Sequence, residues 1–131
     1  MHSFLIGMVL ASLITSPSAS VFAAAESENQ QQSEAIRKYM KENFGHPGME
    51  TSWYSSIVSI TVQGRTVAVR TKINRQGRAK KEAAMGICGA VSGYVFSNGN
   101  QDLGIEHIQI LGTDRGVVVS RRGLTDQCEV R

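Results

Sequence analysis

The sequence predicts an α+β fold in which two helices pack on one face of a four-stranded, mostly antiparallel sheet. Two stretches carry apolar residues at helical spacing, and each is followed by two stretches in which apolar and polar residues alternate. The expected order is therefore α-β-β-α-β-β. The length of 131 residues and the hydrophobic fraction of 41% suit one small domain, and they exclude a long disordered polymer, a collagen-like repeat and a multi-span membrane protein.

The first expected helix begins near Ser33, a suitable N-cap, and Gly45 can end it in the left-handed conformation. The apolar residues of this helix recur at helical spacing: Ile36, Tyr39, Met40 and Phe44. After Trp53 the period changes to two, with a short turn at Gln63-Gly64. The alternating apolar residues are Val58, Ile60, Val62, Val67, Val69 and Ile73. This pattern predicts a β-hairpin with one apolar face.

A second helix is expected from Ala79 to Phe96. Three glycines lie within it: Gly86, Gly89 and Gly93. Each interior glycine costs about 1 kcal/mol relative to alanine. Close approach of a packed neighbour is the favoured reason for the glycines, and a ligand held against the helix backbone is the alternative. Two more alternating segments, 107–110 and 117–120, complete the expected sheet.

The N-terminal segment predicts export. An uncharged apolar stretch, residues 4–14, is shorter than the roughly 20 residues that span a bilayer, and it has the length of a signal-peptide core. Small residues then permit cleavage after Ala23 or Ala25. We therefore expect no transmembrane span and a periplasmic or secreted protein, with a buried N-terminal helix as the alternative. The expected divisions are a signal peptide over 1–25, a flexible tether over 26–33 and a single α+β domain over 34–131.

The two cysteines are Cys88 and Cys128. In an oxidising compartment two thiols usually pair, so we expect a disulfide that holds the C-terminal tail against the second helix. The alternatives are two free or metal-binding thiols and a catalytic Cys88. Neither cysteine has another Cys or His beside it at ligand spacing, so no metal site and no cofactor are expected.

Cations gather between the second expected strand and the second helix, with no acid before Glu82. They are Arg70, Lys72, Arg75, Arg78, Lys80 and Lys81. A helix N-terminus among cations favours anions, so the segment predicts an anion-binding or partner-binding patch. Arg121 and Arg122 join it if the final strand lies near the first hairpin. The alternative is a solvated charged loop. Nucleic acid is not expected as a partner, because the chain is exported and the sheet face lacks aromatic stacking platforms.

Trp53 and Tyr54 stand side by side before the first strand and predict an aromatic contact with a partner, with a place in the core as the alternative for Trp53. His46 and His107 are the histidines beyond the leader. No nucleophile elbow and no phosphate-binding loop accompanies them. The sequence therefore favours a protein without catalysis.

The stretch Ile57 to Leu111 combines Gly64 between alternating strands, a following helix and a Gly104-Ile105 step into another strand. In this it resembles the BON-type domains of bacterial envelope proteins, small αββ-built modules that associate with outer-membrane lipid or with partners. The resemblance covers under half of the chain and implies an architecture. It carries over no functional residue. The Gly and Cys residues of the second helix depart from the pattern of those modules.

Together these observations favour a small exported, non-catalytic binding module whose partner is a protein or an anionic envelope component. One alternative is a periplasmic inhibitor or immunity protein of an exported hydrolase. The second alternative is a small enzyme that uses His46 or His107.

Overall fold

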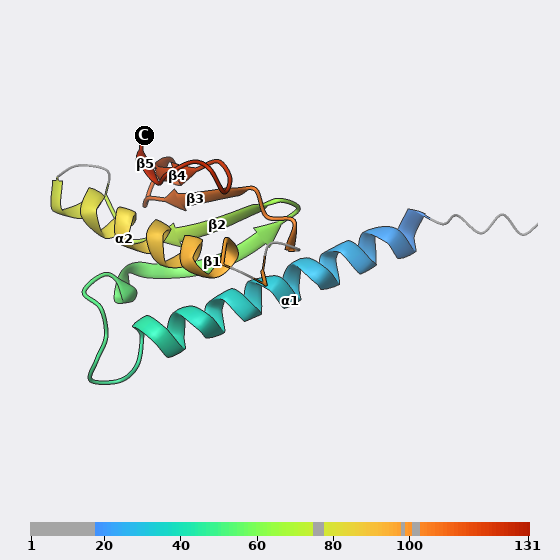
Figure 1. The fold of residues 1–131 in the computed structure, drawn as a ribbon, viewed down its shortest axis with the longest axis horizontal. Coiled ribbons are helices and arrows are strands. Elements are labelled where there is room, and N and C mark those ends of the chain that lie inside the picture. Colours follow the sequence, from blue (N-terminus) through green and yellow to red (C-terminus); the bar gives the residue numbers. More distant parts are fainter. Residues whose placement is uncertain (1–17, 75–77, 98, 101–102) are drawn as a thin grey trace, which may run out of the picture.

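The computed structural model describes residues 18–74, 78–97, 99–100 and 103–131 (Figure 1). The predicted core of the signal peptide, residues 4–14, lies outside this part of the chain. The elements in chain order are α1 (Ser18–Phe44), the short 3-10 helix η1 (Tyr54–Ser56), β1 (Ile57–Gln63), β2 (Thr66–Thr71), α2 (Arg78–Val95), β3 (His107–Leu111), β4 (Val117–Arg121) and β5 (Glu129–Val130). The predicted α+β class is confirmed.

The strands form one five-stranded sheet in the order β1-β2-β3-β4-β5, so the prediction of four strands is wrong. The added strand, β5, has two residues, which is too short to show any alternation in the sequence. The sheet is mixed, because β2 and β3 are parallel whereas the other neighbours are antiparallel. Since α2 connects β2 to β3, the chain makes the helical crossover that parallel neighbours require.

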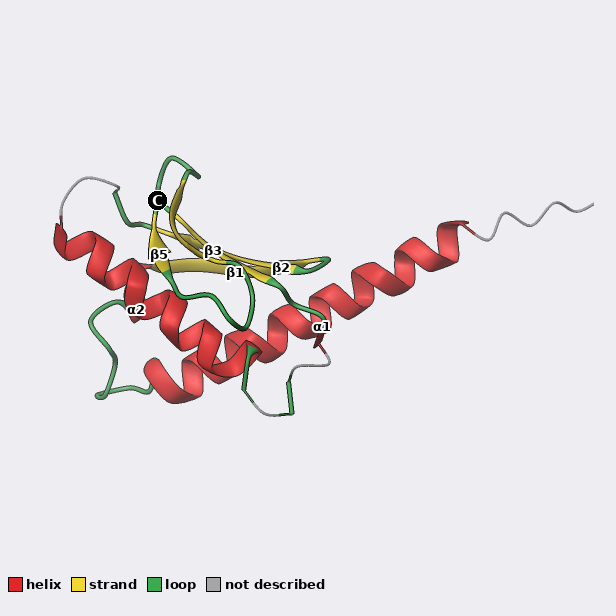
Figure 2. Cartoon of the chain, turned by 45° about the horizontal axis from the view of Figure 1, so that its top comes forward, coloured by secondary structure: helices red, strands yellow, loops and turns green. Residues whose placement is uncertain are grey.

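Both helices pack on the same face of the sheet, as predicted (Figure 2). α1 packs on β1, whereas α2 lies over β3 and β4. Core residues occupy alternate positions on β1, β2 and β3 and one stripe on each helix, because those positions face the space between the two layers, whereas three successive residues of β4 are buried. The buried residues include Ile36, Met40, Ile60, Val62, Val67, Val69, Ile87, Val91, Ile108, Ile110 and Val119.

The opposite face of the sheet is largely polar. One row of paired residues crosses all five strands at Thr61, Ala68, Gln109, Ser120 and Glu129. These positions alternate with the core positions, so their side chains point away from the helices. This face offers hydrogen-bonding groups rather than a broad apolar surface.

α1 begins at Ser18, so the predicted N-cap at Ser33 and the predicted flexible tether over 26–33 are wrong. Residues 18–33 include several Ala, Glu and Gln residues, which favour helix, and they continue the helix that packs on β1. The side chains of residues 21–28 are all exposed, and α1 extends past the sheet there (Figure 1). Ser33 lies within the helix and donates its hydroxyl hydrogen bond to the Asn29 carbonyl at 2.7 Å.

The predicted disulfide between Cys88 and Cys128 is confirmed, with the two Cα atoms 6.1 Å apart. Cys88 is fully buried on α2, so the bond fixes the end of the chain against the helix layer. Just beyond it, β5 pairs with β4, and the Arg131 N–H donates to the Val118 carbonyl at 2.9 Å. The tail is therefore held at the sheet edge farthest from β1.

Candidate functional site

The predicted cationic patch is only partly described. Arg70 is exposed on the face of β2 away from the helices, and Lys72 is exposed just after that strand. Lys80 and Lys81 are exposed in the first turns of α2. Arg75 and the side chain of Arg78 lie outside the described part of the chain. We call Arg70, Lys72, Lys80 and Lys81 the connection patch.

Arg121 and Arg122 do not join the connection patch. Arg121 pairs with Ile108 at the start of β3, whereas Arg70 is paired with Leu111 at the end of that strand. The guanidinium of Arg121 lies 4.5 Å from the ring centroid of Phe96 and donates to carbonyls of the following loop. The sheet register thus places Arg121 and Arg122 at the end of the sheet opposite to Arg70.

Trp53 and Tyr54 separate into different roles. Trp53 is half-buried, with its ring centroid 5.2 Å from that of Phe44. A Cβ atom added at Gly86 would lie 2.7 Å from the Trp53 ring nitrogen, so close packing explains this glycine of α2. Tyr54 packs against Gly45 and also lines a groove on the surface. Both side chains are therefore partly buried against the core, and Tyr54 in addition lines the groove.

The other two glycines of α2 have no close neighbour. A Cβ atom at Gly89 would meet nothing within 4 Å, and one at Gly93 would make an ordinary contact with the Tyr39 hydroxyl oxygen at 3.8 Å. Close packing therefore accounts for Gly86 alone, and nothing in the structure explains Gly89.

The two histidines lie on different parts of the described chain, in the loop after α1 and at the start of β3. His46 is exposed in the loop after α1, where its Nδ1 atom lies 3.2 Å from the Pro47 carbonyl oxygen. His107 is half-buried at the start of β3. Among the residues described, no group of three or more His, Cys, Asp or Glu side chains could hold a metal ion.

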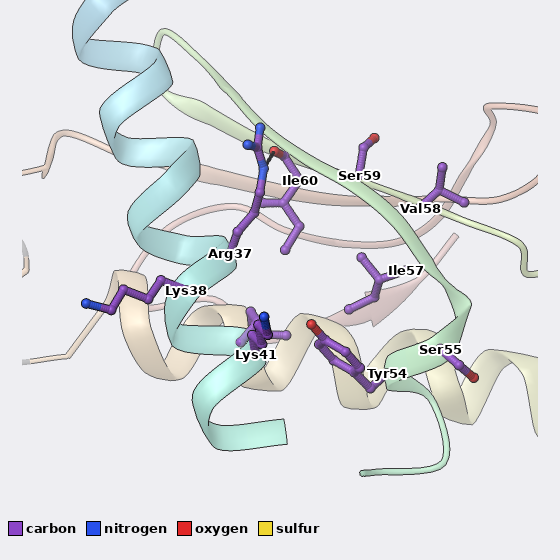
Figure 3. Close-up of a pocket in the computed structure, with 10 residues that line it drawn as sticks. Arg37, Lys38, Lys41, Tyr54, Ser55, Ile57, Val58, Ser59 and Ile60 are labelled. Atoms are coloured by element: carbon purple, nitrogen blue, oxygen red, sulfur yellow. Dashed lines mark hydrogen bonds between the residues drawn. The ribbon is translucent and has the colours of Figure 1, made fainter. Parts of the chain in front are cut away.

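A surface hollow with a volume of about 660 Å³ lies between the second half of α1 and β1 (Figure 3). We call it the α1–β1 groove. Tyr54 and Ile57 project into it from the β1 side, toward α1. Its lining residues are Arg37, Lys38, Met40, Lys41, Tyr54, Ser55, Ile57, Val58, Ser59 and Ile60. One wall is therefore a run of α1 and the other is the outer edge of the sheet.

Two side chains of α1 hydrogen-bond to the outer edge of β1. Arg37 donates through Nε to the Ile60 carbonyl at 3.0 Å, as Figure 3 shows. The Val62 N–H donates to the Ser33 hydroxyl oxygen at 2.8 Å. These contacts occupy backbone groups that would otherwise be open to another strand, because β1 is the terminal strand of the sheet. They protect the second half of β1 and leave its first half facing the groove.

The charge of the α1–β1 groove has one sign. Among the described residues that line it, three are cations and none is an Asp or Glu. Lys38 has an exposed i,i+4 ion pair with Glu42 at 3.9 Å, whereas Lys41 has no ion pair within the described chain. The groove also presents apolar surface, including Val58, which is 52% exposed. Such a combination suits a ligand that carries negative charge and an apolar group.

No sequence pattern indicates this groove, because Arg37, Lys38 and Lys41 have the pattern of a solvated helix face. Their common feature is that they flank Met40, which is fully buried against β1. Only the packing of α1 beside an edge strand brings these cations to the groove, where Arg37 reaches a backbone carbonyl of β1.

Comparisons with protein-family models, with curated proteins and with solved structures give no match for this chain. Neither helix of the described residues has an apolar stretch long enough to cross a membrane. The site must therefore be interpreted from its own geometry.

Proposed function

We propose that the chain is a small exported binding module without catalytic activity, and that an anionic partner binds in the α1–β1 groove. The observation that supports this proposal is the lining of the groove. Three cations, an apolar wall and the open part of a sheet edge line it, and none of its described lining residues is acidic. Water-exposed cations attract an anionic partner at long range, while the apolar wall favours close contact. The proposal thus moves the binding surface from the predicted connection patch to the groove.

Export is supported by three observations. The uncharged stretch 4–14 and the small residues near Ala25 have the pattern of a signal peptide. The disulfide between Cys88 and Cys128 is of the kind that persists in oxidising compartments. Residues 21–28 are exposed, so cleavage in this region removes no core contact.

Export is tested by mass spectrometry of native material without reduction. We expect a chain that begins at Ala24 or Glu26 and carries one disulfide. An intact leader together with two alkylatable thiols would overturn the assignment to the periplasm or the exterior.

Binding is tested with two double charge reversals that change the net charge equally. Lys38→Glu with Lys41→Glu alters the groove, and Lys80→Glu with Lys81→Glu alters the connection patch. Polyglutamate and phosphatidylglycerol vesicles serve as anionic probes, and phosphatidylcholine vesicles as the neutral control. We expect the groove variant to weaken anionic binding by about tenfold and the connection variant by much less, with both effects smaller at high salt.

The opposite ranking of the two variants would assign binding to the connection patch instead. Absence of binding to every anionic probe would refute the proposal. Recovery of an exported hydrolase that the chain inhibits through the groove would assign the partner to the inhibitor class.

A further inference from the structure

We infer that the occupant of the α1–β1 groove is an extended acidic peptide segment of a protein partner, which adds to the sheet as a strand beside β1. The inference rests on the proposed function and deepens it. Its basis is the direction of the backbone groups of β1, together with the charge of the opposite wall.

The backbone of β1 offers hydrogen-bonding groups to the groove. In an antiparallel pair, alternate residues direct both N–H and C=O away from the paired strand. The Ile60 carbonyl and the Val62 N–H point outward, because they bond to Arg37 and Ser33 of α1. Ile60 is two residues before Val62, so its N–H also points outward, and no further described strand lies beside β1. Because the Ile60 carbonyl is already bonded to Arg37, the Ile60 N–H is the outward group of this residue that remains for a strand at the groove.

A bound strand would pass between this edge and α1. The lining of the groove follows the chain from Tyr54 to Ile60 on one side and from Arg37 to Lys41 on the other. Side chains of an extended segment alternate in direction, so every second side chain faces the same wall. Such a segment can pair with the edge through its backbone, pack an apolar side chain against Ile57 and place a carboxylate near Lys41. Addition of a strand to an exposed edge is a recurrent mode of peptide recognition.

Charge distinguishes this occupant from a second copy of the chain. If two copies paired through β1, the two sets of Arg37, Lys38 and Lys41 would face each other across the new strand pair. Like charges brought together in this way oppose association. An acidic segment has the complementary charge, and its carboxylates would supply the partner that Lys41 lacks within the described chain.

The experiment uses a blocked peptide of alternating glutamate and valine, about six residues long, which at ~3.3 Å per residue is enough to follow the edge. Two further peptides carry N-methyl groups on all valines or on all glutamates. In a bound strand only one of these sets of N–H groups faces β1. We expect one N-methylated peptide to bind about tenfold more weakly than the other, and amide hydrogen exchange at Ile60 to slow when the unmodified peptide binds.

The same titration on the two charge-reversal variants completes the test, with the melting temperature of each variant confirming that it folds. We expect weaker peptide binding for the Lys38→Glu, Lys41→Glu variant and near-unchanged binding for the Lys80→Glu, Lys81→Glu control.

Salt-sensitive binding that does not distinguish the two N-methylated peptides would overturn strand addition and leave the proposed function standing. Binding to phosphatidylglycerol vesicles without peptide binding would assign a lipid instead. A dimer that the groove variant strengthens would assign a second copy. Binding to no anionic probe would overturn both proposals.

Discussion

The two edges of the sheet are protected in different ways. At one edge β5, with two residues, is fixed by the covalent bond between Cys88 and Cys128. At the other edge β1, with seven residues, is covered by side-chain hydrogen bonds from α1 at Ile60 and Val62. Exposed edges invite pairing with other chains, and proteins usually shield them. The comparison indicates that the β5 edge is short and anchored by a covalent bond, whereas the β1 edge is shielded in part by α1 and open beside the cationic groove.

The largest expected effect on stability concerns the β5 edge. Replacing both cysteines by Cys88→Ser and Cys128→Ser removes a cross-link whose loop-closure contribution is roughly 4 kcal/mol. We expect the free energy of unfolding to fall by a value of this size in urea denaturation. Amide exchange should accelerate first in β5 and at the Arg131 N–H. If exchange at β1 accelerated equally, the two edges would not be independent.

Ser33→Ala tests how far α1 side chains protect the β1 edge. The Val62 N–H is buried and loses its acceptor, which costs about 1–3 kcal/mol of unfolding free energy. Thermal or urea denaturation measures the loss. Ser55→Ala in the exposed wall of the groove is the matched control, and it should change stability by less than about 0.5 kcal/mol. Equal effects of the two substitutions would show that the hydroxyl of Ser33 does not protect β1.

Gly86→Ala tests the contact that joins α2 to the aromatic residues beside the groove. The added methyl group would overlap the Trp53 ring, and overpacking outweighs the gain in helix propensity. We expect a net loss of about 1–2 kcal/mol in unfolding free energy, together with a changed Trp53 fluorescence spectrum. A neutral or stabilising result would mean that Trp53 moves aside at little cost.

Gly89→Ala is the opposite case on the same helix. The added Cβ meets nothing within 4 Å, so only the helix propensity changes. We expect stability to rise by about 0.5–1 kcal/mol in the same denaturation assay. A loss of stability or of peptide binding would show that the bare backbone at Gly89 has a role that packing does not explain.

The smallest expected effect is a pH dependence of stability that arises from Asp126, in the loop before β5. The backbone N–H groups of Gln127 and then Arg122 hold the pKa of Asp126 below its usual value. A depressed folded-state pKa favours folding above the unfolded pKa, and this contribution is lost as pH falls through the folded pKa. Asp126→Asn should therefore reduce the fall in melting temperature on acidification. An unchanged acid profile would exclude Asp126 as a source of that dependence.

Much of the fold follows from local sequence patterns. The alternation around Ile60 and Val69 and the helical spacing around Ile87 predict the elements and their buried faces, because periodicity records which side is apolar. The pattern does not reveal β5, which is too short, nor the helical conformation of residues 26–33, where a polar and mostly exposed segment resembles a tether. The parallel pairing of β2 and β3 follows from the helix between them, a rule of connection rather than of composition.

The sequence predicts less of the candidate site than of the fold. The disulfide followed from the count of two cysteines and the expected compartment. The connection patch was visible as a run of cations, but sheet register separates Arg121 from Arg70 by the length of β3. The groove depends on a helix and a strand whose proximity is set by tertiary packing, so Lys38 and Lys41 have no distinctive sequence signal.

The exposed first turns of α1 have a practical consequence for anyone handling the molecule. At 1.5 Å per residue, the helix places Glu26 about 22 Å along its axis from Lys41. A label, an affinity tag or an attachment to a sensor surface at Glu26 would therefore stand clear of the groove. Immobilisation through that end leaves the binding surface accessible, and the rigid projection acts as a built-in spacer.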